Sequence, residues 1–466
     1  MRSPETSIVR HAPFWPLFTK ELWDVLSDKA LWTMLLLLCP LIGYSFVQAV
    51  SLYSEASVAA LQSPVLARGL SPLDGVLVPS LGAWYVGTTL LFPFVAIRVL
   101  SQEKESGALR LLVQLPYRSS TLVVAKLVAV LAAWGLASLP ALSAMGIWGL
   151  LGGHVSPPET LNLLAGHLCY GILVGAIALF SASLSDSAAT AAIITLAFTI
   201  GSWVLDFTLA GRPGVLAWIA GLSLTQTLRP FEQGLLEGAL VVGIVAAIGG
   251  FSALAAVWLP PGVSVRTKLV RSLGCVLVTG GILGLATQVS VALDVTEEQR
   301  NSFPAADQRA LEQMTQLLVV TVHLAPEDPR YADLQREVLA KLARTLPHAT
   351  IHLASGRHTL AGSAGDEAYG EVEYAYGTRA ATSRSTSPRE ILPLLYGLAQ
   401  EPVPTATVAG ESPGYPCVAN ALAALFWFCG GLPLVIVVTW WWSRRPPRID
   451  DSICMLEVNH ADHEEP

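Results

Sequence analysis

The chain has 466 residues, of which 53% are hydrophobic and only 14% are charged, and its mean hydropathy is +0.53. Soluble domains carry about 25% charged residues, so this composition indicates a chain that lies mostly in lipid. A net charge of −7, with no basic stripe of interleaved aromatic residues, excludes nucleic acid as the expected partner. Six cysteines without a C-x-x-C pair exclude an obvious zinc or redox motif.

Long apolar segments recur along the chain. A bilayer core of about 30 Å needs roughly 20 apolar residues in one helix. The sequence therefore predicts a polytopic α-helical membrane protein with about eight transmembrane helices. Only Ser185, Asp186 and Ser187 separate the fourth segment from the fifth, which predicts a tight hairpin. The predicted spans are 31–50, 76–97, 122–148, 163–184, 188–205, 235–259, 269–293 and 418–440.

Lysine and arginine are distributed unequally between the loops. With the N-terminus inside, the cytosolic segments hold fifteen of them, and the short outer loops hold three, Arg68, Arg212 and Arg229. Positive charge collects on the cytosolic side of membrane proteins. We therefore expect an inner (cytoplasmic) membrane protein with both termini in the cytosol. The tryptophan run 440–442 before Arg444 fits an aromatic anchor at that surface.

Residues 1–30 precede the first span and predict an interfacial helix. Apolar residues at helical spacing share one face, and the charged residues lie elsewhere. The alternative is a simple extension of the first span. No small-residue cleavage pattern follows that span, so we expect no cleavable signal peptide. The apolar set is Phe18, Leu22, Val25 and Leu26, and the charged set is Lys20, Glu21, Asp24 and Asp28.

A charged, amphipathic stretch at 98–126 lies between the second and third spans. We predict a helix over 102–116 whose charged residues face the cytosol, while its leucines hold the other face to the membrane. Such a helix can fit into a cleft of a soluble partner. The alternative is an ordinary charged loop. The charged set is Glu103, Lys104, Glu105 and Arg110, and the apolar set is Leu109, Leu111, Leu112 and Leu115.

Residues 294–416 are polar and numerous enough to form a core of their own. A β run at 317–324, a helix at 329–346 and a strand at 349–354 form a βαβ pattern. We therefore predict an extracytoplasmic α/β domain between the last two spans. Its other predicted elements are a helix at 304–316, a strand pair around 367–381 and a helix at 388–400, before a Pro-rich linker at 401–416.

The sequence contains no convincing catalytic or metal-binding motif. The phosphate-binding G-x-x-x-x-G-K-[ST] motif is absent. We therefore expect no enzyme activity, and no cofactor bound directly by this chain. Residues 410–414 match G-x-S-x-G, but Pro413 lacks the N–H that an oxyanion hole needs. His348 and His352 flank a predicted strand too far apart to share a metal ion.

One pattern in the charged stretch resembles a known family. The spacing E-x-G-x-L-x-L-L-x-x-x-P-x-R is similar to the coupling segment of type-2 ABC exporter permeases, which contacts their ATPase. The K-E-L of Lys20, Glu21 and Leu22 resembles the interfacial helix that opens those permeases. The residues of the coupling pattern are Glu105, Gly107, Leu109, Leu111, Leu112, Pro116 and Arg118, with Glu103 just upstream.

The resemblance implies a type-2 ABC exporter fold and a separate ATPase subunit that binds ATP and Mg²⁺. It also implies a second permease, either another copy or a paralogue, that meets the second and fifth spans. Small residues at 181–192 would permit close helix approach there. The implied organisation is an interfacial helix (1–30), a six-span permease domain (31–260), a seventh span (261–293), the outer domain and linker (294–416), an eighth span (417–442) and a cytosolic tail (443–466).

The polar domain carries a second resemblance. Its opening DVTEEQRNSFPAADQRALEQM and the following VVTVHLAPEDPRYADLQREV resemble the extracytoplasmic auxiliary domain of gliding-motility-type ABC systems. That resemblance implies an envelope partner for the outer domain. The alternative function is then a non-transporting mechanotransmitter or assembly factor, in which ATP turnover moves this domain against the envelope partner.

Overall fold

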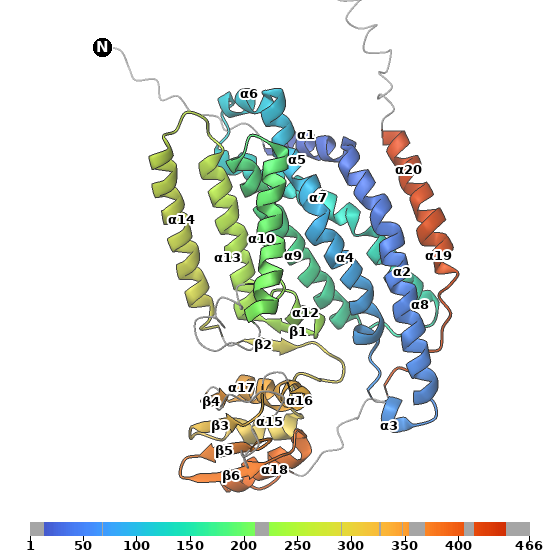
Figure 1. The fold of residues 1–466 in the computed structure, drawn as a ribbon, viewed down its shortest axis with the longest axis vertical. Coiled ribbons are helices and arrows are strands. Elements are labelled where there is room, and N and C mark those ends of the chain that lie inside the picture. Colours follow the sequence, from blue (N-terminus) through green and yellow to red (C-terminus); the bar gives the residue numbers. More distant parts are fainter. Residues whose placement is uncertain are drawn as a thin grey trace, which may run out of the picture.

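The computed structural model describes residues 14–67, 69–209, 223–289, 291–325, 328–346, 348–353, 369–404 and 414–443. Long helices run side by side as a bundle, and a smaller α/β unit lies beyond one end of it (Figure 1). The short helix α6 (Ala108–Gln114) lies at the opposite end of the bundle. We call these two ends the α/β end and the α6 end.

Eight helical segments among the described residues are long and apolar enough to cross a membrane, so the chain is a multi-pass membrane protein. The predicted hairpin is present, because the fourth segment ends at Leu184 and the fifth begins at Ala188. The segments are α2 (Lys29–Ala60), then η1 (Leu73–Leu77), α4 (Val78–Leu90) and α5 (Phe92–Ser106) in succession, α7 (Ser119–Ala137) with α8 (Leu139–Leu150), α9 (Pro157–Leu184), α10 (Ala188–Leu209), α13 (Gly238–Trp258), α14 (Val265–Ala286), and α19 (Ala424–Phe426), η3 (Trp427–Gly431) and α20 (Leu432–Ser443) in succession.

Prolines set the breaks inside the long segments. Pro93 is near the start of α5, just after α4 ends, and Pro140 is near the start of α8, just after α7 ends. Proline lacks an N–H and its ring clashes with the preceding turn, so it fits a first turn more readily than a helix interior, although Pro40 lies inside α2. Helix α5 then continues to Ser106, well beyond residue 97, where the second span was predicted to end.

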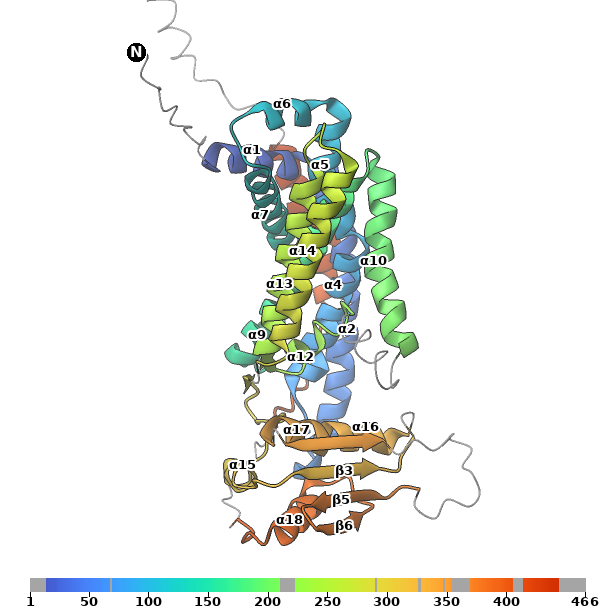
Figure 2. The ribbon, with the colours of Figure 1, turned by 90° about the vertical axis from the view of Figure 1, so that its left-hand side faces the viewer.

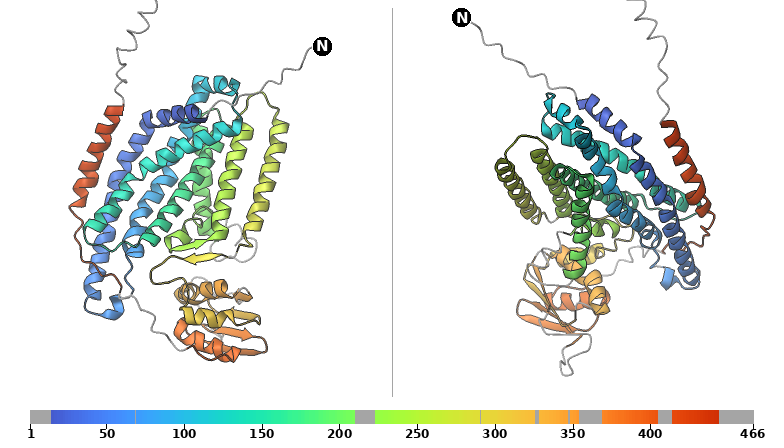
Figure 3. Two further views of the ribbon diagram at one scale, coloured as in Figure 1. Left: turned by 180° about the vertical axis from the view of Figure 1, so that it is seen from behind. Right: turned by 45° about the horizontal axis from the view of Figure 1, so that its top comes forward.

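Helix α9 lies at the centre of the bundle and packs against α5, α7, α10 and α13. Glycine permits the approach of α7, since a Cβ at Gly171 would overlap the ring of Trp134. The small residues expected to face a second permease are partly used within this chain, because Ser181, Ala182 and Ala191 are buried. Helix α14, by contrast, lies at the edge of the bundle beside α13 (Figures 1 and 3).

The α/β unit is built on a four-stranded sheet of order β4-β3-β5-β6. Strands β3 and β4 are parallel, and the helical crossover between them confirms the predicted βαβ pattern. The sheet stands with β4 toward the bundle and β6 farthest from it (Figures 1 and 2). Its elements are α15 (Ala305–Glu312), β3 (Leu318–Val322), α16 (Pro329–Leu334), η2 (Gln335–Leu339), α17 (Ala340–Thr345), β4 (Ala349–Leu353), β5 (Val372–Tyr376), β6 (Arg379–Ser383) and α18 (Pro388–Ala399).

Alternate residues of the two central strands make the core of this unit. Side chains two apart on a strand point to the same face. Leu318 and Val320 of β3 are buried on the same face as their register partners in β5, Tyr376 and Tyr374. The helices of the unit cover that face as one apolar cluster. The unit therefore has a hydrophobic core separate from that of the bundle.

A two-stranded sheet links the α/β unit to the bundle. Strand β2 (Ala292–Asp294), which follows α14, pairs antiparallel with β1 (Leu235–Glu237), which precedes α13. The short helix α12 (Arg229–Glu232) lies just before β1. This pairing explains why the sixth helix begins at Gly238 rather than 235, and why the seventh ends at Ala286 rather than 293. The outer segment 210–222 and the predicted tail beyond Ser443 lie outside the described residues.

The segment that leads from the α/β unit into the last span is hydrogen-bonded to the first span. Ser54 Oγ of α2 donates to Ala419 O at 2.8 Å and accepts from Ala419 N at 3.0 Å. Ser57 Oγ accepts from Cys417 N at 3.0 Å. Residues three apart lie on one face of a helix, so the two serines bind an extended strand of chain. This contact places the last span beside the first.

Replacing Gly43 with alanine should lower the thermal unfolding midpoint of the protein in detergent. The added Cβ would overlap Phe428 of η3, and overpacking typically costs about 1–3 kcal/mol. Gly135→Ala in α7 is the matched control, because nothing lies within 4 Å of its Cβ position and alanine favours helix. Equal midpoints for the two variants would contradict the packing of the last span on α2.

Candidate coupling site at the α6 end

Helix α1 (Phe14–Ser27) lies across the ends of the spans rather than along them (Figure 2). It packs mainly on α7, and its buried residues Leu17, Glu21 and Val25 are one turn apart. Trp15 and Trp23 are exposed, as suits indole rings at a membrane surface. The prediction that Glu21 lies off the buried face is wrong, because its side chain is fully buried.

Glu21 is buried because α5 and α7 bring charged partners to it. Lys126 Nζ of α7 lies 2.7 Å from Glu21 Oε2 and 2.6 Å from Glu103 Oε2. Lys20 Nζ lies 3.1 Å from Glu21 Oε1 and also pairs with Glu103. We call these four residues the charge cluster. The prediction that Glu103 faces the cytosol is therefore wrong, because its carboxylate is buried between two lysines.

The charges of this cluster balance, as burial requires. An unpaired ion in a low-dielectric site is costly. Burial disfavours the charged form of Lys20, but its hydrogen bond to Glu103 and the charge of Glu21 outweigh that effect and raise its pKa. Burial raises the pKa of Glu21, and the ion pair with Lys126 opposes that change.

The carboxylates could suggest a metal ion. Oxygens of Glu21, Asp24 and Glu103 lie within 4.8 Å of one another. However, the Lys20 ammonium group already contacts all three carboxylates, at 3.2 Å in the case of Asp24. We therefore assign these residues to ion pairing between helices and not to metal binding.

Lys104, next to Glu103 in α5, bonds to a different part of the bundle. Its Nζ donates to Ser183 O at 3.0 Å and to Ser185 O at 2.8 Å. These carbonyls end α9, where backbone acceptors lack intrahelical donors and a cation is favoured. Lys104 therefore ties α5 to the α9–α10 hairpin. The sequence placed Lys104 on a solvent-facing surface, and only the tertiary structure brings it to these carbonyls.

Gly107 separates α5 from α6, so the prediction of one continuous helix over 102–116 is wrong. Its φ of +78° lies in the left-handed region, which glycine adopts readily. The chain turns there, and α6 lies across the bundle end (Figure 2). Leu109 of α6 is buried, whereas Leu111 of the same helix is 68% exposed. The prediction that these two leucines share one membrane-facing side is therefore wrong.

The outward side of this turn combines charged and apolar groups. Leu112 packs against the core and holds α6 in place. Leu115 is extended, with ψ of 155°, as expected for a residue before a proline. The exposed residues, which we call the elbow surface, are Glu105, Arg110, Leu111, Leu115, Pro116 and Arg118.

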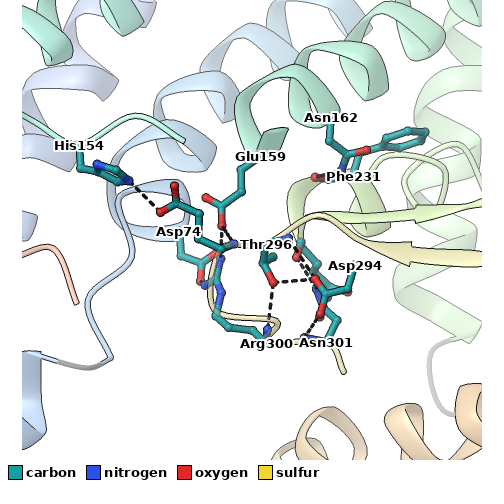
Figure 4. A network of polar contacts seen from close by, with 11 residues as sticks. Asp74, His154, Glu159, Asn162, Phe231, Asp294, Thr296, Arg300 and Asn301 are labelled. Atoms are coloured by element: carbon teal, nitrogen blue, oxygen red, sulfur yellow. Dashed lines mark hydrogen bonds and ion pairs between the residues drawn. The ribbon is translucent and has the colours of Figure 1, made fainter. Parts of the chain in front are cut away.

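A second polar constellation lies at the α/β end (Figure 4). Arg300 pairs with Asp74 at the start of the second span, and its Nη2 lies 3.9 Å from Glu159 Oε1 in the first turn of α9. Glu159 Oε1 also accepts from Glu297 N at 3.0 Å, and His154 Nε2 lies 2.8 Å from Glu297 Oε2. We call these five residues the Arg300 joint.

Asp294 shapes the turn that presents Arg300. Its carboxylate accepts from Thr296 N at 3.1 Å and Asn301 N at 2.8 Å (Figure 4). It also accepts from Ser302 Oγ at 3.0 Å. The sequence did not indicate the joint, because no local pattern connects residues such as Arg300 and Asp74, which are 226 positions apart. The joint attaches the segment that leads into the α/β unit to the second and fourth spans at once.

These features define a polytopic membrane protein with a helix across its α6 end, an elbow after the second span and a separate α/β unit. Residues 15–205 match the family model described as ABC-2 family transporter protein. The match supports an ABC-2 type permease, the membrane subunit of an ABC transporter, and that family implies partnership with an ABC ATPase. It covers α1, the charge cluster and the elbow. Neither the curated proteins nor the solved structures gave a match.

Replacing Lys126 with methionine should strongly destabilise the protein. Removing one partner of a buried ion pair typically costs about 3–5 kcal/mol, because the remaining charges are left uncompensated. Adding Glu21→Gln removes the surplus negative charge and should recover part of the loss. Monodisperse yield and thermal unfolding in detergent measure both effects. A Lys126→Met variant as stable as the parent would show that the cluster contributes little to the fold.

Proposed function

We propose that this chain is the permease subunit of an ATP-driven exporter and that a separate ATPase subunit docks on the elbow surface. The observation that carries the proposal is the exposure of Leu111 next to Arg110 on α6, which lies across the span ends, with Glu105 exposed at the end of α5. An exposed apolar side chain ringed by charges is typical of a protein-binding surface. The chain itself would bind no ATP or Mg²⁺ and catalyse no reaction, because the separate ATPase subunit would bind the nucleotide and the ion and hydrolyse ATP.

The contacts around the elbow suggest how force would enter the bundle. Glu103 and Lys104 are adjacent in α5, yet they bond to different helices, Glu103 to α1 and α7 and Lys104 to the end of α9. Adjacent residues on a helix point about 100° apart. A push on α6 would therefore move α5 against two sets of spans as packed rigid bodies.

The second span also reaches the opposite end of the bundle. The segment Leu73–Ser106 begins beside Asp74 of the Arg300 joint and ends at the elbow. Its one break is near Pro93. A tilt imposed at the elbow would thus be felt at the joint and by the α/β unit. In this proposal the α6 end is cytosolic in the inner membrane, as the lysine and arginine bias supports, and the α/β unit is extracytoplasmic.

A second permease would complete the transport path. The fifth span, α10, has an apolar face that the described residues leave exposed, which includes Ile193, Ile200 and Val204. We place the second permease, as another copy or a paralogue, against this face and the adjoining second span. An envelope partner would then bind the α/β unit.

The docking proposal predicts that Leu111→Asp releases the ATPase. Loss of a central apolar contact commonly costs about 2 kcal/mol or more, roughly a 30-fold loss of affinity. The measurement is ATP hydrolysis and nucleotide-binding protein recovered with the tagged chain from native membranes. Leu150→Asp is the matched control, because Leu150 is 87% exposed at the end of α8. Retention of the ATPase by Leu111→Asp, or equal loss in both variants, would reject docking at the elbow. Glu103 is unsuitable for this test, because it belongs to the charge cluster.

The coupling proposal predicts that Lys104→Met leaves docking intact but uncouples movement. Spin labels at Gln114 and Ala189, both exposed, report the distance from α6 to the α9–α10 hairpin. We expect this distance to change with nucleotide in the parent complex and to stay fixed in Lys104→Met. Lys268→Met is the matched control, because Lys268 Nζ donates to Trp258 O at 2.9 Å near the end of α13. A normal nucleotide response in Lys104→Met would refute the assigned role.

A further inference from the structure

The third span bends between α7 and α8, and the bend uncovers part of its neighbour. Pro140 in the first turn of α8 cannot donate a backbone hydrogen bond, so the helix changes direction there. Helix α7 packs on α1 and α9, whereas α8 packs mainly on α2. A groove lies between the α7–α8 junction, α4 and α9.

The groove has a volume of about 340 Å³ and opens toward the side of the bundle. Trp84 of α4 and Trp134 of α7 both line it, with ring centroids 5.5 Å apart. Three leucines at its walls are exposed, namely Leu142 (40%), Leu161 (66%) and Leu168 (37%). The other lining residues are Leu81, Ser138, Ala141, Leu164 and Ala165.

The lining accepts hydrocarbon and offers little to a polar ligand. Among the described residues that form it, none is charged, and its single hydroxyl, Ser138 Oγ, already donates to Gly135 O at 2.6 Å. The indole nitrogen of Trp134 is buried against Gly171 on the far side. A sugar, nucleotide or headgroup would lose hydrogen bonds to water here without replacement, which is costly.

The position of the groove identifies what fills it. Its residues belong to the first half of α9 and α4 and to the bend of the third span, so it lies in the half of the bundle nearer the α/β end. Its exposed leucines belong to membrane-spanning helices. At the inner part of the groove, around Trp134 and Leu168, the surrounding medium is acyl chain.

We infer that the groove binds one acyl chain of a phospholipid from the leaflet on the α/β side of the membrane. The chain would lie over the two tryptophans and fill the gap left by the Pro140 bend. It would thereby connect α4, α8 and α9. Helix α9 carries Glu159 of the Arg300 joint in its first turn, and α4 directly follows η1, which carries Asp74. This inference stands independently of ATPase docking, because the groove and the elbow surface share no residue.

The test uses the full chain in detergent-free nanodiscs that contain a phospholipid with a mid-chain diazirine. After illumination, we expect cross-links to concentrate on peptides covering 134–142 and 161–168. Ala165→Trp fills the groove and should reduce labelling of these peptides to the level of other lipid-facing helices. Ala197→Trp is the matched control, since Ala197 is also exposed on a span, α10, but does not line the groove.

Two results would overturn the inference. Labelling spread evenly over all lipid-facing helices of the parent protein would show only an ordinary lipid shell. Labelling that survives in Ala165→Trp at the parent level would show that the lipid lies elsewhere. Should Ala165→Trp fail to fold, the distribution of cross-links in the parent protein still decides the question. None of these outcomes depends on whether an ATPase binds the elbow surface.

Discussion

The buried ammonium group of Lys126 is the constraint on which the α6 end depends. A lysine in a membrane span needs a carboxylate, and here it takes one from α1 and one from α5. This requirement draws a helix that is not part of the bundle onto the third span. It also fixes the second span immediately before the elbow. The same cluster therefore determines the position of α1 and gives α6 a firm base.

The second span connects the two polar sites of the molecule. At one end Glu103 and Lys104 bond it to two different sets of helices, and at the other Asp74 pairs with Arg300. The intervening helix is broken only near Pro93. Its ion pairs lie at its ends, whereas its middle is held by apolar packing and by a buried hydrogen bond of 2.7 Å between Thr89 Oγ1 and the Tyr170 hydroxyl.

Prolines and glycines determine where the helices break, turn and come into close contact. Pro140 lies at the junction of α7 and α8, next to residues that line the apolar groove, while Gly107 turns α6 across the span ends. Gly43 and Gly171 permit close contact with Phe428 and Trp134. Proline lacks a backbone hydrogen-bond donor and glycine lacks a side chain. The chain can therefore break a helix at the proline, and turn sharply or pack closely against a neighbour at the glycines.

The sequence by itself determined the membrane class, the eight apolar segments, the α9–α10 hairpin and the βαβ pattern, because length and periodicity are local properties. It also located the charged stretch between the second and third spans, but it predicted one continuous helix through Gly107, where the chain turns. Only the tertiary structure decided which charged residues are buried. Glutamate is a residue type usually found on protein surfaces. The burial of Glu21 and Glu103 depends on Lys126, which lies 105 positions from Glu21. The same holds for Lys104 and the Arg300 joint, whose partners come from distant segments, and local patterns carry no information about such pairings.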